Sequence, residues 1–144
     1  MPAVRLSPQL RLAWRMHRWL LRVSRGRIGA RMGPLPVLLL TTTGRTTGRP
    51  RDVGLSFVED DGRYYVVGSY AGEDRDPAWA RNLAANQNAT LSVRGRRRPA
   101  VGRVLEEPER SRMFERFVEL DPAYAEYGQR TQRTIPVIEL TPQD

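Results

Sequence analysis

Short apolar runs separated by turn signals constrain the fold of this chain more than any other feature of its sequence. Each run is too short for an ordinary helix and is rich in β-branched, leucine or aromatic residues, which favours a strand. An acidic turn, Glu59–Arg63, and a basic turn, Arg94–Pro99, each separate two such runs. The predicted strands are Val37–Thr43, Val53–Glu59, Tyr64–Tyr70, Ala89–Val93, Ala100–Leu105 and Ile135–Leu140.

Three further segments have the pattern of helices inserted between these strands. Asp76 before Pro77, and Asp121 before Pro122, each combine a capping residue with a proline that suits a first helical turn. Pro108 opens the remaining segment, and apolar side chains recur after it at helical spacing. The predicted fold is an α+β domain around a barrel of about six mostly antiparallel strands, the first three of them in a meander.

Length and composition fit one domain without covalent or metal staples. A chain of 144 residues buries enough surface for a core of its own. The absence of cysteine and the single histidine, His17, exclude a thiol mechanism and a zinc site, and they suit a reducing compartment. The sequence has no run of about 18 apolar residues that could cross a bilayer, and no apolar segment of a signal peptide. We therefore expect a cytoplasmic protein.

Positive charge is concentrated in the first third of the chain. All 24 basic residues are arginine, the formal net charge is +8, and residues 1–51 contain no aspartate or glutamate. Such a segment suits phosphate ligands, nucleic acid or an anionic membrane surface, and charge alone does not choose among them. The flat guanidinium fork favours phosphate and carboxylate in each case.

Residues 1–34 are predicted to form a basic amphipathic helix and a connector, ahead of a barrel domain at residues 35–144. From Gln9 to Arg25 the arginines recur at helical spacing, and two tryptophans lie among them. This composition is typical of a helix at a membrane surface, here the inner face of the cell membrane. It is equally that of a helix packed on its own domain. His17 lies on this helix without neighbouring triad partners, which argues against catalysis.

The turn Gly44–Arg51, with the sequence GRTTGRPR, is the strongest candidate for an anion site. Its two glycines let the backbone turn tightly and expose N–H groups, while hydroxyl and guanidinium groups add further donors for phosphate or carboxylate. The turn lacks the lysine of a P-loop and the spacing of a dinucleotide fingerprint. A solvated basic hairpin is the alternative. The candidate ligands are Arg45, Thr46, Thr47, Arg49 and Arg51.

Three blocks of the sequence together resemble the deazaflavin-dependent nitroreductase family, split-barrel proteins that bind coenzyme F-420. The blocks are LLLTTTGRTTGRPR, GSYAGEDRDPAWARNLAAN and DPAYAEYGQRTQRTIPVIEL, in the family's order, from about Leu35 to the end of the chain. The resemblance implies that the α+β domain is a split β-barrel and that its cofactor is F-420, an 8-hydroxy-5-deazaflavin.

The resemblance also implies which residues hold the coenzyme. The family's contacts to the phosphate and glutamate tail correspond to Arg45, Thr46, Thr47 and Arg51, with Arg49 as a helper. Segments that line the deazaflavin through backbone groups correspond to Asp52, Val53, Gly54, Leu55 and Ser56, and to Val67, Gly68, Ser69 and Tyr70. Ala78, Trp79 and Asn82 correspond to positions close to the coenzyme. Many relatives carry a basic residue at the position of Thr46 and a lysine at that of Tyr70.

The expected activity is hydride transfer from reduced F-420 to a planar, electron-poor acceptor, either quinone-like or nitroaromatic. Tyr124 and Tyr127 match an aromatic pair that faces the acceptor, and either hydroxyl could stabilise its oxyanion or donate a proton. Core packing is the alternative for this pair, and Trp79 also suits a helix anchor. Two alternative functions are the same barrel binding FMN and a non-enzymatic nucleic-acid binder, and the second lacks a supporting motif.

Overall fold

The computed structural model describes residues 31–32, 34–69 and 76–143 of the chain. The strands in these ranges are β1 (Arg31–Met32), β2 (Leu35–Thr43), β3 (Pro50–Ser56), β4 (Val58–Asp60), β5 (Arg63–Val67), β6 (Asn88–Val93), β7 (Arg96–Val104) and β8 (Val137–Pro142). The helices in these ranges are α2 (Ala78–Ala85), α3 (Glu109–Leu120) and α4 (Ala123–Arg130).

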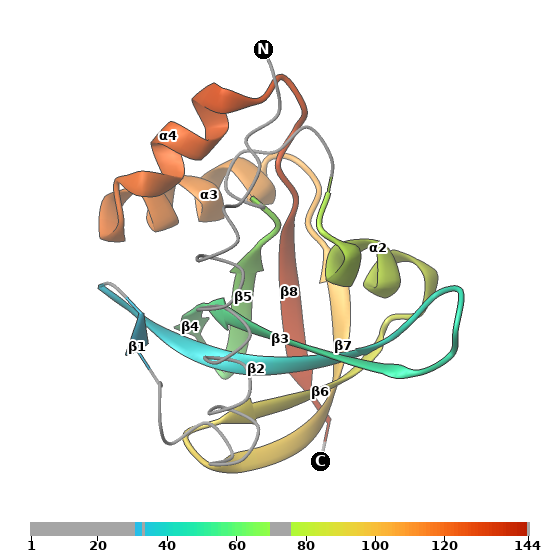
Figure 1. Cartoon of the computed structure of the whole chain (residues 1–144). Coiled ribbons are helices and arrows are strands. Elements are labelled where there is room, and N and C mark those ends of the chain that lie inside the picture. Colours follow the sequence, from blue (N-terminus) through green and yellow to red (C-terminus); the bar gives the residue numbers. More distant parts are fainter. Residues whose placement is uncertain (1–30, 33, 70–75, 144) are drawn as a thin grey trace.

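The strands form one curled antiparallel sheet, which makes up a half-barrel (Figure 1). Their order is β1-β2-β6-β7-β8-β5-β4, and β3 pairs with β2 beside this path. Helix α2 contacts β2 and β7, whereas α3 contacts α4 and β8. The predicted α+β split-barrel class is therefore confirmed, with more strands than the sequence indicated.

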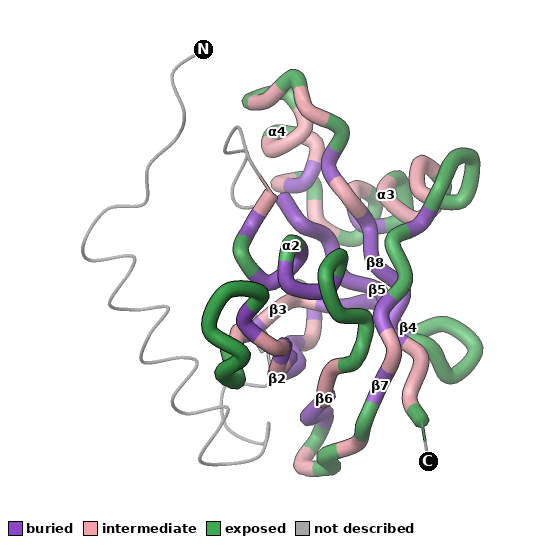
Figure 2. The backbone as a smooth tube through the Cα atoms, turned by 90° about the vertical axis from the view of Figure 1, so that its right-hand side faces the viewer, coloured by how far each residue is buried: buried purple, intermediate pink, exposed green. Residues whose placement is uncertain are grey.

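Alternation along the central strands divides the core into two clusters. In β5, Tyr64 and Val66 belong to one cluster, together with Trp79 of α2. Tyr65 and Val67 belong to the other, which contains the buried side chains of α3 and α4. Because successive side chains of a strand point to opposite faces, β5 is buried on both sides. Figure 2 shows buried residues along β5, β8 and α2, whereas α3 and α4 are mainly intermediate or exposed.

The first three predicted strands pair in the predicted order, but the second is broken in two because the chain bends at Phe57. The ring of Phe57 is 1% exposed, and it lies edge-to-face with Tyr64 at 5.4 Å between centroids. Its N–H donates to the carbonyl of Pro36 at 3.0 Å. The predicted strand Val53–Glu59 is consequently split into β3 and β4, and β5 pairs with β4 and β8 rather than with β3.

Two hairpins close through two-residue turns with positive φ angles. Asp61 and Gly62 have φ of 52° and 75°, and Arg94 and Gly95 have φ of 49° and 83°. Two successive residues in this region match the twist of the flanking strands. The basic turn is therefore shorter than predicted, and Arg96–Pro99 belong to β7.

Both aspartate–proline pairs precede a helix, as predicted, but the proline is the N-cap in each case, and of the two aspartates Asp121 alone bonds to its helix. At α4, Oδ1 of Asp121 accepts the N–H of Ala123 at 3.1 Å. At α2, the N-cap is Pro77 and no side chain caps the helix. Asp76 instead accepts a hydrogen bond from Nη1 of Arg133 at 2.8 Å.

Within the ranges that the structure describes, no helix is long and apolar enough to cross a membrane. The predicted helix Gln9–Arg25 lies outside those ranges, as does Tyr70. Contact of that helix with lipid stays a prediction.

Glu139 places a buried carboxylate on β8, with 5% of the residue exposed. It accepts hydrogen bonds from the hydroxyl of Tyr65 at 3.1 Å and from Nε and Nη2 of Arg103 at 3.3 Å each. Nη1 of Arg63 lies 3.6 Å away. Burial opposes ionisation, but these hydrogen bonds and charges outweigh it and hold the pKa of Glu139 below its usual range. The carboxylate thereby joins β5, β7 and β8.

Replacing Glu139 with glutamine should lower the free energy of unfolding by about 1–2 kcal/mol at pH 7, because Arg103 and Tyr65 lose a charged acceptor. A carboxylate whose folded pKa is depressed stabilises the fold above its unfolded pKa of about 4.3, and this contribution disappears as the pH falls through the folded pKa. Urea unfolding at pH 7, 5 and 3 should therefore show the two proteins converging as the pH decreases. Glu119→Gln, at an exposed position on α3, is the control. A difference between wild type and Glu139→Gln that stays constant with pH would contradict this account.

Candidate functional site

The loop Gly44–Arg49 closes the hairpin between β2 and β3. The N–H of Gly44 donates to the carbonyl of Arg49, and the N–H of Gly48 donates to the carbonyl of Gly44, both at 2.8 Å. Gly48 has a φ of +70°, which favours glycine. A Cβ on Gly44 would lie 2.6 Å from Oγ1 of Thr47, so the tight turn requires glycine there too.

The backbone of this loop bonds mainly to itself. Besides the two glycine N–H groups, the N–H of Arg49 donates to Oγ1 of Thr47 at 3.2 Å. The N–H groups of Gly44 and Gly48 are therefore engaged within the turn itself. All of the predicted ligands are exposed: Arg45, Thr46, Thr47, Arg49 and Arg51.

Arg45 is attached to helix α2 through Asn82. Oδ1 of Asn82 accepts the N–H of Arg45 at 3.2 Å and its Nη1 at 3.0 Å. Nδ2 of Asn82 donates to Oγ1 of Thr42 at 3.1 Å. The structure therefore brings together two predicted positions that lie 37 residues apart.

The remaining predicted residues of α2 differ in their surroundings. Trp79 is 7% exposed and belongs to the core cluster that also contains Leu83. Ala78 is exposed at the start of the helix. Trp79 thus anchors α2 to the barrel, as its alternative interpretation from the sequence proposed.

Strand β3 connects the arginine loop to the predicted acceptor side. It contains the predicted ring-lining residues from Asp52 to Ser56, and Asp52 is fixed by a hydrogen bond of 2.7 Å from Oγ1 of Thr41. Its last residue, Ser56, forms a side-chain hydrogen bond with Tyr124 of α4. The strand has seven residues, which at about 3.3 Å each span roughly 20 Å.

Tyr124 is largely a core residue. It is 8% exposed, and its ring lies edge-to-face with Phe117 at 5.1 Å and with Tyr127 at 5.6 Å. Burial raises the pKa of Tyr124 to about 12 against the lowering effect of the Ser56 hydrogen bond. Tyr127 is less buried, and burial raises its pKa as well. Both hydroxyls are protonated at neutral pH and can donate a hydrogen bond.

The second predicted ring-lining segment is held by Arg133, a residue that the sequence analysis did not single out. Its Nη2 donates to the carbonyls of Gly68 at 3.0 Å and Ser69 at 2.7 Å. Its Nη1 binds Asp76, just ahead of α2. Arg133 follows α4 in the chain, so it connects the helix of the two tyrosines to the segment after β5. A lone arginine in a polar loop carried no sequence signal for this role.

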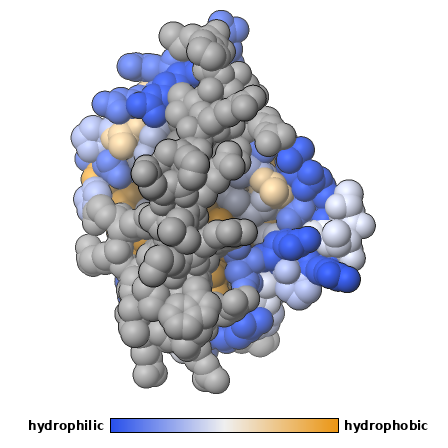
Figure 3. All heavy atoms as spheres, in the orientation of Figure 1, coloured by the Kyte–Doolittle hydropathy of each residue, from blue (hydrophilic) through white to orange (hydrophobic). Residues whose placement is uncertain are grey.

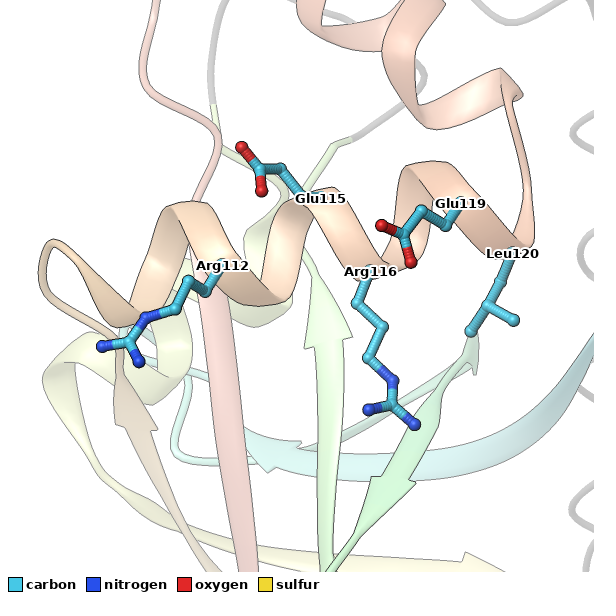
Figure 4. Close-up of a pocket in the computed structure, with 5 residues that line it drawn as sticks. All are labelled: Arg112, Glu115, Arg116, Glu119 and Leu120. Atoms are coloured by element: carbon cyan, nitrogen blue, oxygen red, sulfur yellow. The ribbon is translucent and has the colours of Figure 1, made fainter.

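Figure 3 shows hydrophilic residues gathered on the right-hand side of the molecule, where the β2–β3 loop and α2 project in Figure 1. A separate cavity of about 300 Å³ lies on the outer surface of α3, and none of the predicted site residues lines it (Figure 4). Its lining mixes both charges on one helix, so it offers no defined ligand. The lining residues are Arg112, Glu115, Arg116, Glu119 and Leu120.

Two solved structures are similar to this chain in both fold and sequence. The structure of an F420-H2 dependent reductase, FDR-A, has 38% identity and a TM-score of 0.67, covering 73% of this chain and 93% of its own. Another, described as a domain-swapped dimer, has 32% identity and a TM-score of 0.70, covering 93% of this chain and 99% of its own. Fold and sequence together define a split-barrel oxidoreductase that depends on coenzyme F-420.

The chain belongs to the F420H(2)-dependent quinone reductase family, whose model matches residues 13–142. An F420H(2)-dependent quinone reductase of Mycobacterium tuberculosis is 36% identical over 131 residues, covering 88% of each chain. The resemblance found in the sequence is therefore confirmed, and the cofactor is coenzyme F-420. Membership in this family favours the predicted reductase over the FMN and nucleic-acid alternatives.

Gly68 offers a test of the packing around the second ring-lining segment. A Cβ there would lie 2.8 Å from Cγ of Pro136 and 3.5 Å from Cδ of Pro77. Gly68→Ala should therefore lower the free energy of unfolding by about 1–3 kcal/mol and weaken coenzyme binding, measured by urea unfolding and by fluorescence titration.

Gly128→Ala is the matched control, because its Cβ would meet only Phe114, at 3.6 Å. In the middle of α4, alanine should stabilise the fold by up to about 1 kcal/mol. Equal effects of the two substitutions would show that the contact with Pro136 is unimportant.

Proposed function

We propose that the arginine loop binds the phosphate and glutamate tail of F-420, that β3 runs alongside the coenzyme, and that α4 contacts a quinone-type acceptor. The course of strand β3 is the observation that supports this proposal. It starts beside the exposed arginines and ends at Ser56, which is hydrogen-bonded to Tyr124. An elongated ligand with an anionic end and a planar end fits this arrangement.

The donor set of the loop fits the anionic part of the coenzyme. Within the part of the chain that the structure describes, Arg45, Arg49 and Arg51 form no ion pair with a carboxylate. Exposed guanidinium groups of this kind bind phosphate and carboxylate oxygens through charge-assisted hydrogen bonds. The threonine hydroxyls at positions 46 and 47 add neutral donors.

When bound and reduced, F-420 supplies a hydride for the acceptor. The residues of this chain bind and orient the reactants and provide hydrogen bonds. The hydroxyl of Tyr127 donates a hydrogen bond to the acceptor oxygen on which negative charge develops. Ser56 and Phe117 hold Tyr124, which in turn supports the ring of Tyr127.

The direct test of the activity is oxidation of the reduced coenzyme by different acceptors. Naphthoquinones should oxidise it at a rate proportional to enzyme concentration, followed by the return of deazaflavin absorbance. Nitroaromatic compounds, which share the planar and electron-poor character of quinones, belong in the same assay. Reaction with nitroaromatics alone would overturn the proposed acceptor class.

Arg45→Ala and Arg51→Ala should each weaken coenzyme binding roughly 10- to 100-fold, because each removes charge-assisted hydrogen bonds. The affinity of these variants should also depend less on salt, since fewer charges are involved. Fluorescence titration at several salt concentrations measures both effects. Arg116→Ala, at an exposed position on the outer surface of α3, is the control. Affinities equal to that of the wild type would place the tail elsewhere.

Tyr127→Phe should lower kcat/KM for the quinone about 100-fold or more and leave coenzyme affinity unchanged, because only the acceptor loses a hydrogen-bond donor. Tyr124→Phe should mainly cost about 1 kcal/mol of stability through its bond with Ser56. Since burial raises both pKa values above the ordinary tyrosine value of about 10, activity should not fall through tyrosine ionisation below about pH 9. A larger loss of kcat/KM in Tyr124→Phe than in Tyr127→Phe would reverse the two roles.

A further inference from the structure

We infer that Asn82 is a positioning residue that acts on the coenzyme through Arg45. This inference rests on the proposed function of the arginine loop and goes further, because it separates the residue that contacts the anion from the residue that orients the contact. The resemblance to the family places Asn82 only close to the coenzyme. The hydrogen bonds in the structure give it a narrower task.

The polar atoms of Asn82 are already engaged within the protein. Asn82 as a whole is 3% exposed. An amide oxygen accepts two hydrogen bonds, and both of those at Oδ1 come from Arg45, one from the backbone and one from Nη1. Nδ2 donates to Thr42, which is 2% exposed. Oδ1 of Asn82 is therefore fully used, and the burial of the residue leaves little room for an anion to reach the remaining N–H of Nδ2.

The two bonds to one oxygen fix Arg45 at both of its ends. The backbone bond sets the start of the loop, and the Nη1 bond sets the tip of the side chain. A guanidinium carries five N–H donors, so the bond to Asn82 leaves most of them for an anion. An exposed arginine otherwise loses side-chain entropy when a ligand immobilises it. Restraining Arg45 beforehand reduces this cost of binding.

Asn82 is held in place by well-packed neighbours on α2 and β2. Trp79 and Leu83 flank it on α2, and both are buried in the core cluster. Thr42, the partner of Nδ2, lies within β2, which is paired with β3 on one side and β6 on the other. Among the residues that the structure describes, none accepts a hydrogen bond from the guanidinium of Arg49 or Arg51 as Asn82 does from that of Arg45. Arg45 is thus distinguished from its two neighbours by its connection to the barrel.

A double-mutant cycle on coenzyme affinity tests the inference. Asn82→Ala should weaken binding of F-420 roughly tenfold, or about 1.4 kcal/mol. In an Arg45→Ala background the same substitution should change the affinity less than about twofold, because the guanidinium that it positions is gone. In an Arg51→Ala background its full effect should remain. Asn88→Ala, an exposed asparagine on β6, is the matched control.

Two further readouts separate positioning from a general loss of structure. Binding of a deazaflavin fragment without phosphate and glutamates should be unaffected by Asn82→Ala, whereas the KM for intact F-420 should rise. If Asn82→Ala does not fold, Thr42→Val, which removes the partner of Nδ2, takes its place in the same cycle.

The outcomes distinguish this inference from the proposed function. If Arg45→Ala binds F-420 as tightly as the wild type does, the proposed role of the loop is refuted. If Arg45→Ala weakens binding but Asn82→Ala weakens it equally in the wild-type and Arg45→Ala backgrounds, then only the positioning role is refuted. Weaker binding of the tail-free fragment also refutes it.

Discussion

The pairing of β2 along both of its edges is the constraint on which the rest of the structure depends. Its residues from Val37 to Thr43 pair with β3, and Leu39–Thr42 pair with β6. Leu38 and Leu40 are fully buried in the larger core cluster. The same strand ends at the arginine loop and provides Thr42 to Asn82. Burial at one end of β2 therefore fixes the position of the exposed cations at the other.

The regular parts of the fold could be predicted because local sequence determines them. Runs of β-branched residues and glycine-containing turns located most strands, and the aspartate–proline pairs located two helices. The bend at Phe57 could not be predicted, because a buried aromatic residue within an apolar run resembles strand interior. Only its packing on Tyr64 and its bond to Pro36 show that the chain changes direction there.

The candidate site also has a part that could be predicted from the sequence and a part that could not. The exposed arginines of the loop were visible in the sequence because charge and glycine spacing are local properties. Their attachment was not, since Arg45 meets Asn82 only after α2 has folded against β2. The role of Arg133 likewise depends on three partners distant in sequence. How these residues meet the coenzyme stays a proposal, supported by family membership and by the geometry of β3.

The internal hydrogen bonding of the β2–β3 loop has a consequence for how such proteins diverge. Because Gly44 and Gly48 close the turn with their own N–H groups, and Thr47 and Asn82 hold its remaining bonds, the shape of the backbone does not depend on the side chain at position 46. The side chain at position 46 can then change without rebuilding the hairpin. Under the proposed function, such substitutions adjust the affinity for the coenzyme in small steps while the barrel remains the same.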